Sequence, residues 1–258
     1  MFGGYELNKR AGVNPPYSPA YPLEWEAELR TLEVVTRVEG AKVDAMLAET
    51  PFERVGDRVA FRFMLSPRHT LGVDSGEIHD LMVSVPVRYG DLVAHTHIFM
   101  YTSEPIGITA GREVFGYTKK DGDFVFAEQE SGEISGSVSR RGHRLADYRF
   151  VPDPSAPSVR LVEAGPPAEG EIHVRRLPHP DGSGVAYADV VYRKTPLAYT
   201  TPVAGTVEMT LHSCEWDPLA DLAPEVLGAH FMTSDVFGGG FAKEDRRLLE
   251  RLTPPPQG

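Results

Sequence analysis

The chain has 258 residues, of which 41% are hydrophobic and 24% are charged, as is usual for a globular protein. Its formal net charge of −11 argues against nucleic-acid and anionic-membrane partners, because both bind basic surfaces. No apolar run approaches the roughly 20 residues that cross a bilayer. The first ten residues lack the apolar core of a signal peptide, and the single cysteine, Cys214, cannot form an internal disulfide. Together these features predict a cytoplasmic protein.

The order of elements along the chain predicts a mainly β protein. Residues 1–24 are rich in Gly, Pro and Tyr and indicate an irregular N-terminal arm. Alternating and β-branched runs then predict short strands at 29–38, 58–65, 80–87, 94–101, 123–130, 133–140, 144–151, 171–177, 184–192 and 204–214. Many short strands separated by Gly and Pro are typical of an antiparallel barrel or sandwich. No repeat or shift in composition divides the chain, so 1–258 is predicted to be a single domain.

Few segments of the chain favour helices. Residues 43–48 suit one short helix, and leucines at helical spacing predict a closing helix at 243–252. Gly238–Gly240 is interpreted as a flexible turn before that helix, and the Pro-rich residues 152–167 as a surface loop.

Two adjacent lysines carry the most chemical information in the sequence. They end the segment Gly111-Arg-Glu-Val-Phe-Gly-Tyr-Thr-Lys-Lys120. A lysine amine is nucleophilic at neutral pH only if its pKa falls well below about 10.4, which a second cation or a dry pocket can achieve. Taken alone, the pair before Asp121-Gly-Asp123 also suits a solvated turn.

The segment 104–120 resembles the signature of the acetoacetate decarboxylase family, which carries a Gly-Arg-Glu segment, an aromatic residue and a Lys-Lys pair. Three further blocks occur in the order of that family: Ser18-Pro-Ala-Tyr-Pro22, Val85-Pro-Val-Arg-Tyr-Gly90 and Asp217-Pro-Leu-Ala-Asp-Leu-Ala-Pro224. The resemblance implies a β-barrel or cone-like core around a small pocket, with a few short helices, and it implies homo-oligomers.

Several site residues are carried over with the resemblance. Lys119 matches the lysine that forms the Schiff base, and Lys120 matches its neighbour. In an extended segment the two side chains point to opposite faces, so desolvation could contribute as much as Lys120 to activating Lys119. Arg112 and Glu113 match the family's Arg-Glu, with a structural ion pair as the favoured interpretation. Thr118 replaces the family's usual proline.

The sequence departs from the family at two charged positions. One family carboxylate falls on Asp80, which is one methylene shorter than the family's Glu and is either a proton carrier or a solvated side chain. The other falls on Arg62, which would bind a substrate carboxylate if it faced the pocket and would be solvated if it pointed outward. The family's substrate-binding arginine aligns near Arg30, although strict register places Leu29 there. Tyr117 is a second candidate for moving protons.

The first interpretation is a Schiff-base lyase acting on a small oxo acid through Lys119. Aldolase or dehydratase chemistry and classical acetoacetate decarboxylation remain open within that class, and a non-catalytic small-ligand-binding protein is the alternative from another class. We expect no cofactor. His95 and His97 alternate on one strand face and could in principle bind a metal with His79. Without Glu or Cys at ligand spacing we expect no metal, and a histidine proton shuttle is favoured instead.

Overall fold

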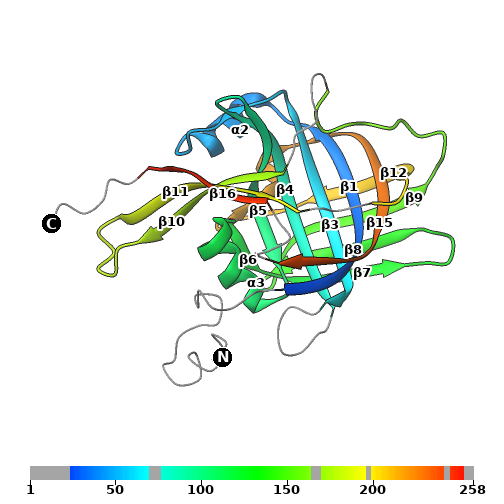
Figure 1. The fold of residues 1–258 in the computed structure, drawn as a ribbon. Coiled ribbons are helices and arrows are strands. Elements are labelled where there is room, and N and C mark those ends of the chain that lie inside the picture. Colours follow the sequence, from blue (N-terminus) through cyan, green and yellow to red (C-terminus); the bar gives the residue numbers. More distant parts are fainter. Residues whose placement is uncertain (1–23, 70–76, 164–169, 196–198, 241–244, 253–258) are drawn as a thin grey trace, which may run out of the picture.

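The computed structural model describes residues 24–69, 77–163, 170–195, 199–240 and 245–252 (Figure 1). Strands dominate this part of the chain. They are β1 Glu24–Arg37, β2 Glu53–Arg54, β3 Arg58–His69, β4 Ile78–Tyr89, β5 Leu92–Thr102, β6 Lys119–Asp121, β7 Asp123–Glu128, β8 Ile134–Arg140, β9 His143–Pro152, β10 Glu171–Pro178, β11 Val185–Lys194, β12 Val203–Leu211, β13 Ser213–Cys214, β14 Asp217–Pro218, β15 Glu225–Gly240 and β16 Asp245–Arg251. The helical elements are α2 Gly40–Leu47, α3 Pro105–Ala110, the π-helix η2 Gly111–Phe115 and the 3₁₀ helix η3 Leu219–Leu222.

One large sheet contains nearly all of these strands. Its order is β16-β11-β10-β5-β4-β3-β1-β15-β12-β9-β8-β7, with β2 added beside β4 and β6 beside β5. Pairing is antiparallel except where β5 meets β10 and β6, which lie parallel to it. The mainly β, antiparallel architecture expected from the sequence is confirmed. The strand path of the described residues is open, with β16 and β7 at its two ends.

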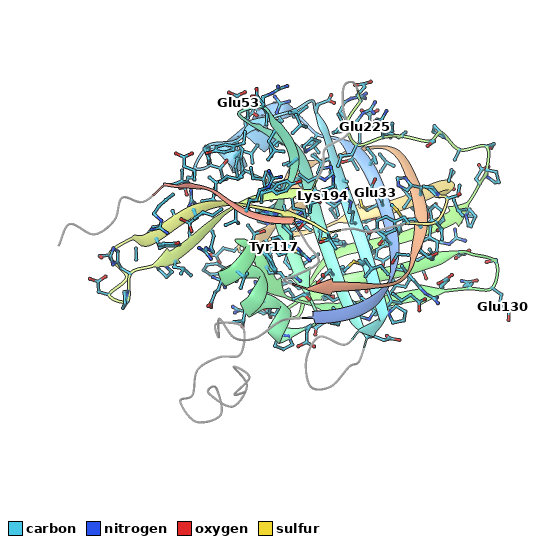
Figure 2. The ribbon with its side chains drawn as sticks, in the orientation of Figure 1. Glu33, Glu53, Tyr117, Glu130, Lys194 and Glu225 are labelled. Atoms are coloured by element: carbon cyan, nitrogen blue, oxygen red, sulfur yellow. The ribbon has the colours of Figure 1, made fainter. Side chains whose placement is uncertain are left out.

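The centre of the sheet has one apolar face and one polar face. Alternate residues of β1, β3 and β4, among them Leu32, Phe63 and Leu81, are buried in the hydrophobic core. The intervening residues include polar and charged side chains such as Asp80 and Ser84, and the register pairs Glu33 of β1 with Arg62 of β3. Tyr117, from the segment before β6, is also buried, and its ring packs against His97 of β5 (Figure 2). Two-residue periodicity therefore separates the core from a buried polar face, on which the candidate site lies.

Most elements expected from the sequence are present. All ten predicted strands correspond to strands of the sheet, and α2 matches the expected helix at 43–48. Residues 1–23 of the expected arm lie outside the described residues, and Glu24 opens β1. Within the described residues, no helix is both long and apolar enough to span a membrane.

Two expectations near the C-terminus are wrong. Within the predicted helix at 243–252, residues 245–251 instead form β16, because they pair with the edge of β11 along Asp189–Lys194; residues 243–244 lie outside the described part of the chain. Gly238–Gly240 is not a turn but the end of β15, where it pairs with Glu24–Glu26 of β1. In both places, hydrogen bonding to an available strand edge overrides local propensity.

A short helical segment between β5 and β6 was not expected. α3 continues directly into η2, and Tyr117 N–H then bonds back to the Gly111 carbonyl at 2.9 Å. A π-helical turn is uncommon and often occurs at functional sites. The segment leads the chain into β6, the strand that begins with Lys119.

Candidate functional site

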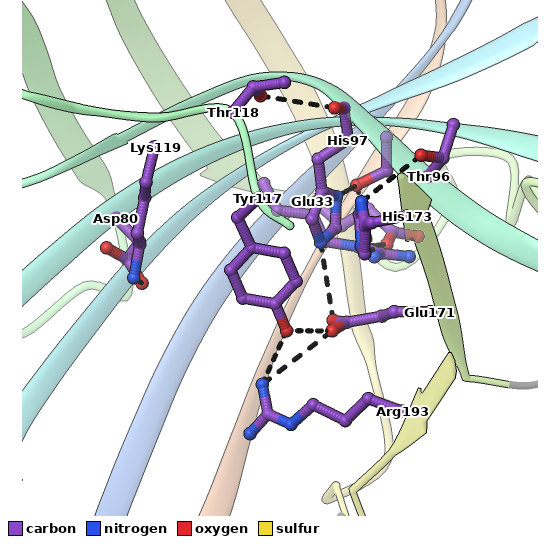
Figure 3. Close-up of polar contacts among 12 residues, drawn as sticks. Glu33, Asp80, Thr96, His97, Tyr117, Thr118, Lys119, Glu171, His173 and Arg193 are labelled. Atoms are coloured by element: carbon purple, nitrogen blue, oxygen red, sulfur yellow. Dashed lines mark hydrogen bonds and ion pairs between the residues drawn. The ribbon is translucent and has the colours of Figure 1, made fainter. Parts of the chain in front are cut away.

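Lys119 is buried, with its amine beside a carboxylate. The parallel pairing of β6 with β5 aligns Lys119 with Met100 and fixes which face the side chain takes. The side chain is about 10% exposed, and Nζ donates to Oδ2 of Asp80 at 3.3 Å (Figure 3). The structure thus brings together two of the residues singled out in the sequence, on neighbouring parts of the sheet.

Two glycines of the helical segment allow the lysine to lie there. A Cβ at Gly111 would come within 2.9 Å of Cδ of Lys119 and 3.2 Å of the Tyr117 ring. A Cβ at Gly107 would lie 3.5 Å from Nζ itself. Gly107 and Gly111 are four residues apart, so both face the lysine across one side of the helical segment. A glycine is therefore needed at this position of the Gly-Arg-Glu motif, because any side chain there would collide with Lys119.

Lys120 points to the opposite face of β6. Its Nζ donates to Oδ1 of Asp217 at 2.7 Å and to the Trp216 carbonyl at 3.0 Å. Asp217 is almost fully buried, and burial would raise the pKa of its carboxyl. Hydrogen bonds from Lys120, Tyr101 and Arg140 outweigh burial and lower that pKa instead. Lys120 is therefore part of an ion cluster remote from the Lys119 amine.

Asp80 has one oxygen with a partner and one without. It is 5% exposed on β4, and its Oδ2 accepts from Lys119. Oδ1 is buried and has no hydrogen-bond partner among the described residues. A buried carboxylate oxygen without a donor is energetically costly, so it marks a position where a bound molecule or water would be stabilised. Asp80 is thus not the solvated side chain that was one of its two interpretations.

Arg62 is neither solvated nor next to Lys119. Its Nε donates to Oε2 of Glu33 at 2.5 Å, and Glu33 also lies 3.4 Å from Nε2 of His230. Burial opposes ionisation of Glu33, but the charges of Arg62 and His230 hold the pKa of that carboxyl below its usual value. The register runs from Arg62 through Met82 and Met100 to Lys119, so three strand spacings separate the two cations on one face.

The other carried-over residues lie away from the amine. Arg30 forms an ion pair with Glu128 of β7 at 2.6 Å. It is an odd number of residues from Glu33 on β1, so its side chain projects from the face of the sheet opposite to that of Glu33. Arg112 is exposed, and within the described residues no ion pair joins it to Glu113. Burial raises the pKa of the Glu113 carboxyl, and its backbone carbonyl accepts from Arg175 of β10. That bond holds η2 against the sheet.

Tyr117 lies between the lysine and a second buried polar group (Figure 3). Its hydroxyl donates to Oε2 of Glu171 and accepts from Nη1 of Arg193 at 2.6 Å. Its ring packs edge-on against His97 and His173, with centroids 5.5 and 4.7 Å away. Burial raises the pKa of Tyr117 well above its usual value, so the phenol stays protonated at neutral pH.

Glu171, His173 and Arg193 were not singled out in the sequence. They come from β10 and β11, and β10 joins the site through a single parallel bridge between Glu171 and His95. The available signal was the alternation of Glu171 with His173, which matches the alternation of His95 with His97. Of the three histidines considered for a metal, only His97 contributes to this group; His79 stacks on Phe124 instead.

Comparisons with known proteins agree with this architecture. The family model described as "Acetoacetate decarboxylase (ADC)" matches residues 12–248. An acetoacetate decarboxylase of Acidiphilium cryptum is 25% identical over 247 residues, covering 89% of this chain and 93% of that protein.

Solved structures show the same fold at lower identity. Acetoacetate decarboxylase from Legionella pneumophila superposes with a TM-score of 0.73 at 18% identity, covering 91% of this chain and 89% of that one. The enduracididine biosynthesis enzyme MppR complexed with pyruvate gives 0.68 at 14% identity, covering 88% and 93%. An acetoacetate decarboxylase-like enzyme from Sphingomonas wittichii gives 0.70 at 18%, covering 86% and 95%. Since the family model spans most of its length, the chain belongs to the acetoacetate decarboxylase family.

Proposed function

We propose that the protein is an enzyme that forms a Schiff base between Lys119 and a small oxo acid. The observation that carries the proposal is the buried Lys119 amine, 3.3 Å from Asp80 and enclosed by Gly107 and Gly111. A buried amine beside a carboxylate can lose its proton locally and attack a carbonyl carbon. Family membership supports the same chemistry.

The two side chains suffice for iminium formation. Transfer of the ammonium proton to Asp80 leaves the Nζ lone pair free to attack the substrate carbonyl. The attacking nitrogen then loses a second proton, which passes to the carbonyl oxygen and gives a neutral carbinolamine. Asp80 then returns a proton to the hydroxyl, which leaves as water while the C=N⁺ bond forms. The second oxygen of Asp80, Oδ1, is the atom left to accept a hydrogen bond from the reacting molecule.

For the step after the iminium, we propose aldol or dehydratase chemistry in which the substrate carboxylate is retained. Loss of carbon dioxide is favoured when uncompensated negative charge faces the substrate carboxylate. Here Glu33 has Arg62 and His230 as partners, and Glu171 lies 3.8 Å from Arg193. A structure similar to this one, MppR, is described with pyruvate and with a condensation product of pyruvate and an aldehyde, which supports a 2-oxo acid.

Acetoacetate decarboxylation is the second candidate, because the family description and the Acidiphilium cryptum relative both carry that name. The two are separated by supplying pyruvate and acetoacetate to the same preparation. Borohydride should trap a pyruvate adduct, and carbon dioxide release from acetoacetate should be weak or absent. Rapid release would replace the proposal with the decarboxylase. Absence of any adduct with either acid would favour a non-catalytic binding protein.

The contact with Glu33 favours a structural role for Arg62 over the expected grip on a substrate carboxylate. Arg62→Ala should lower the free energy of unfolding by about 3–5 kcal/mol, because it leaves Glu33 buried without its guanidinium. Denaturant unfolding measures this loss, and the double variant Glu33→Gln/Arg62→Met should recover much of it. A stable Arg62→Ala protein whose dissociation constant for pyruvate rises about tenfold or more would instead return Arg62 to substrate binding.

A further inference from the structure

Three potential metal ligands converge behind Tyr117. His97 comes from β5, and Glu171 and His173 come from β10, two strands that meet in parallel. One ligand atom from each lies within 4.8 Å of the others. Both histidines are almost fully buried, at 2% and 3% exposure, while Glu171 keeps about a quarter of its side chain exposed. Figure 3 shows the three side chains gathered on the side of Tyr117 away from Lys119.

Each imidazole is oriented through its other ring nitrogen. Nδ1 of His97 lies 2.9 Å from the Ser84 hydroxyl, and Nδ1 of His173 lies 3.3 Å from the Thr96 hydroxyl. Both Nε2 atoms are buried, and neither has a hydrogen-bond partner among the described residues. Holding Nδ1 with a neighbouring group while Nε2 is presented is the usual arrangement of metal-binding histidines. Two buried ring nitrogens that lack hydrogen-bond partners are energetically costly unless a bound ion or molecule contacts them.

The two carboxylate oxygens of Glu171 likewise have different surroundings. Oε2 of Glu171 accepts from the Tyr117 hydroxyl and lies 3.8 Å from Arg193. Oε1 lies 3.4 Å from Nε2 of His97, a contact that is an ion pair only when that imidazole is protonated. Two ligands of a tetrahedral zinc ion, each about 2.0–2.2 Å from the metal, are about 3.4 Å apart. The spacing of this pair therefore already suits a shared ion.

We propose that His97, Glu171 and His173 form a binding site for a divalent transition metal, with Zn²⁺ as the representative ion. Two histidines and one carboxylate are a ligand set of catalytic zinc sites, which keep a fourth position for water or substrate. Tyr117, Ser84 and Thr96 act as positioning residues around it. The site does not involve the Lys119 amine, so it stands or falls separately from the proposed Schiff-base function.

The test uses the full chain without a histidine tag, stripped with a chelator and titrated with Zn²⁺ by calorimetry. One ion per chain should bind, and Co²⁺ in its place should give the visible absorption of a low-symmetry site. His173→Ala and Glu171→Gln should each abolish this binding. Thr96→Val keeps all three ligands and the fold but should weaken the affinity about 10–100-fold through the released Nδ1.

Two control variants test whether Zn²⁺ binding depends on these three residues. His230→Gln removes a histidine that also lies 3.4 Å from a glutamate, Glu33, but lacks a second imidazole, so binding should be unchanged. Lys119→Ala should bind Zn²⁺ like the unaltered chain. Stoichiometric binding that persists in both His173→Ala and Glu171→Gln, or no binding by the unaltered chain, would overturn the metal site. In the latter case the three residues are a metal-free polar group behind Tyr117.

Discussion

Replacing Lys119 with alanine is expected to abolish adduct formation with any oxo acid in the presence of borohydride. The reason is geometric, since Nζ of Lys119 lies 3.3 Å from Oδ2 of Asp80 and close to the backbone of Gly107. Intact mass should show the reduced adduct on the unaltered chain and none on Lys119→Ala. Peptide mapping should place the adduct on Lys119 itself.

Lys120→Ala is the matched control, because it removes the neighbouring amine without touching the Lys119 side of β6. It should still form the adduct, since Lys120 faces Asp217 on the opposite side. It should lose some stability, because Asp217 is left with fewer donors for a buried carboxylate. An adduct mapped to Lys120, or one that survives in Lys119→Ala, would reject Lys119 as the nucleophile.

The role of the second lysine also bears on how the first is activated. A neighbouring cation lowers the pKa of an amine only if the two charges lie close together in a poorly screened setting. Lys120 is directed away from Lys119 and is paired with Asp217. Within the proposed mechanism, burial of Lys119 and proton transfer to Asp80 therefore replace repulsion between the two lysines as the means of activation.

Features that depend on neighbouring residues in the sequence could be predicted, whereas features that depend on contacts between distant strands could not. Strands can be predicted because alternation is a local pattern. A motif singles out Lys119 and a strand position singles out Asp80, and the structure places these two side chains 3.3 Å apart. The prediction of a helix at 243–252 is wrong because leucine spacing is a local pattern. The pairing with the edge of β11 that overrides it depends on how distant strands are arranged.

The partners of Arg62 and Glu171 could not be predicted from local sequence patterns. Arg62 belongs with Glu33 only through the register of β1 and β3, and Glu171 reaches His97 only through the bridge from β10 to β5. The alternation of Glu171 with His173 is visible in the sequence, but nothing in the residues around either pair identifies the partner strand. A charged residue on a strand can be assigned to a face from sequence, but its counter-ion on that face depends on which strands are neighbours.

Asp80→Asn is expected to slow turnover far more than it weakens binding of the oxo acid. Asparagine keeps the size of the side chain and an oxygen that can accept from Lys119, but it cannot take or return a proton. Loss of a general acid–base group typically costs about 10²–10⁴-fold in rate. Rapid-mixing measurements of iminium formation and steady-state turnover with pyruvate and an aldehyde would separate the rate from the dissociation constant.

Asp80→Glu provides the conservative comparison. It restores a proton-carrying group with one more methylene, so it should retain much more activity than Asp80→Asn, and the pH profile of iminium formation should shift rather than vanish. If Asp80 only held Lys119 in position, asparagine and glutamate would have similar effects, and the pH profile of Asp80→Asn would match that of the unaltered chain. Unchanged turnover in Asp80→Asn would remove this carboxylate from the mechanism and leave the protons to Tyr117, whose hydroxyl is already held between Glu171 and Arg193.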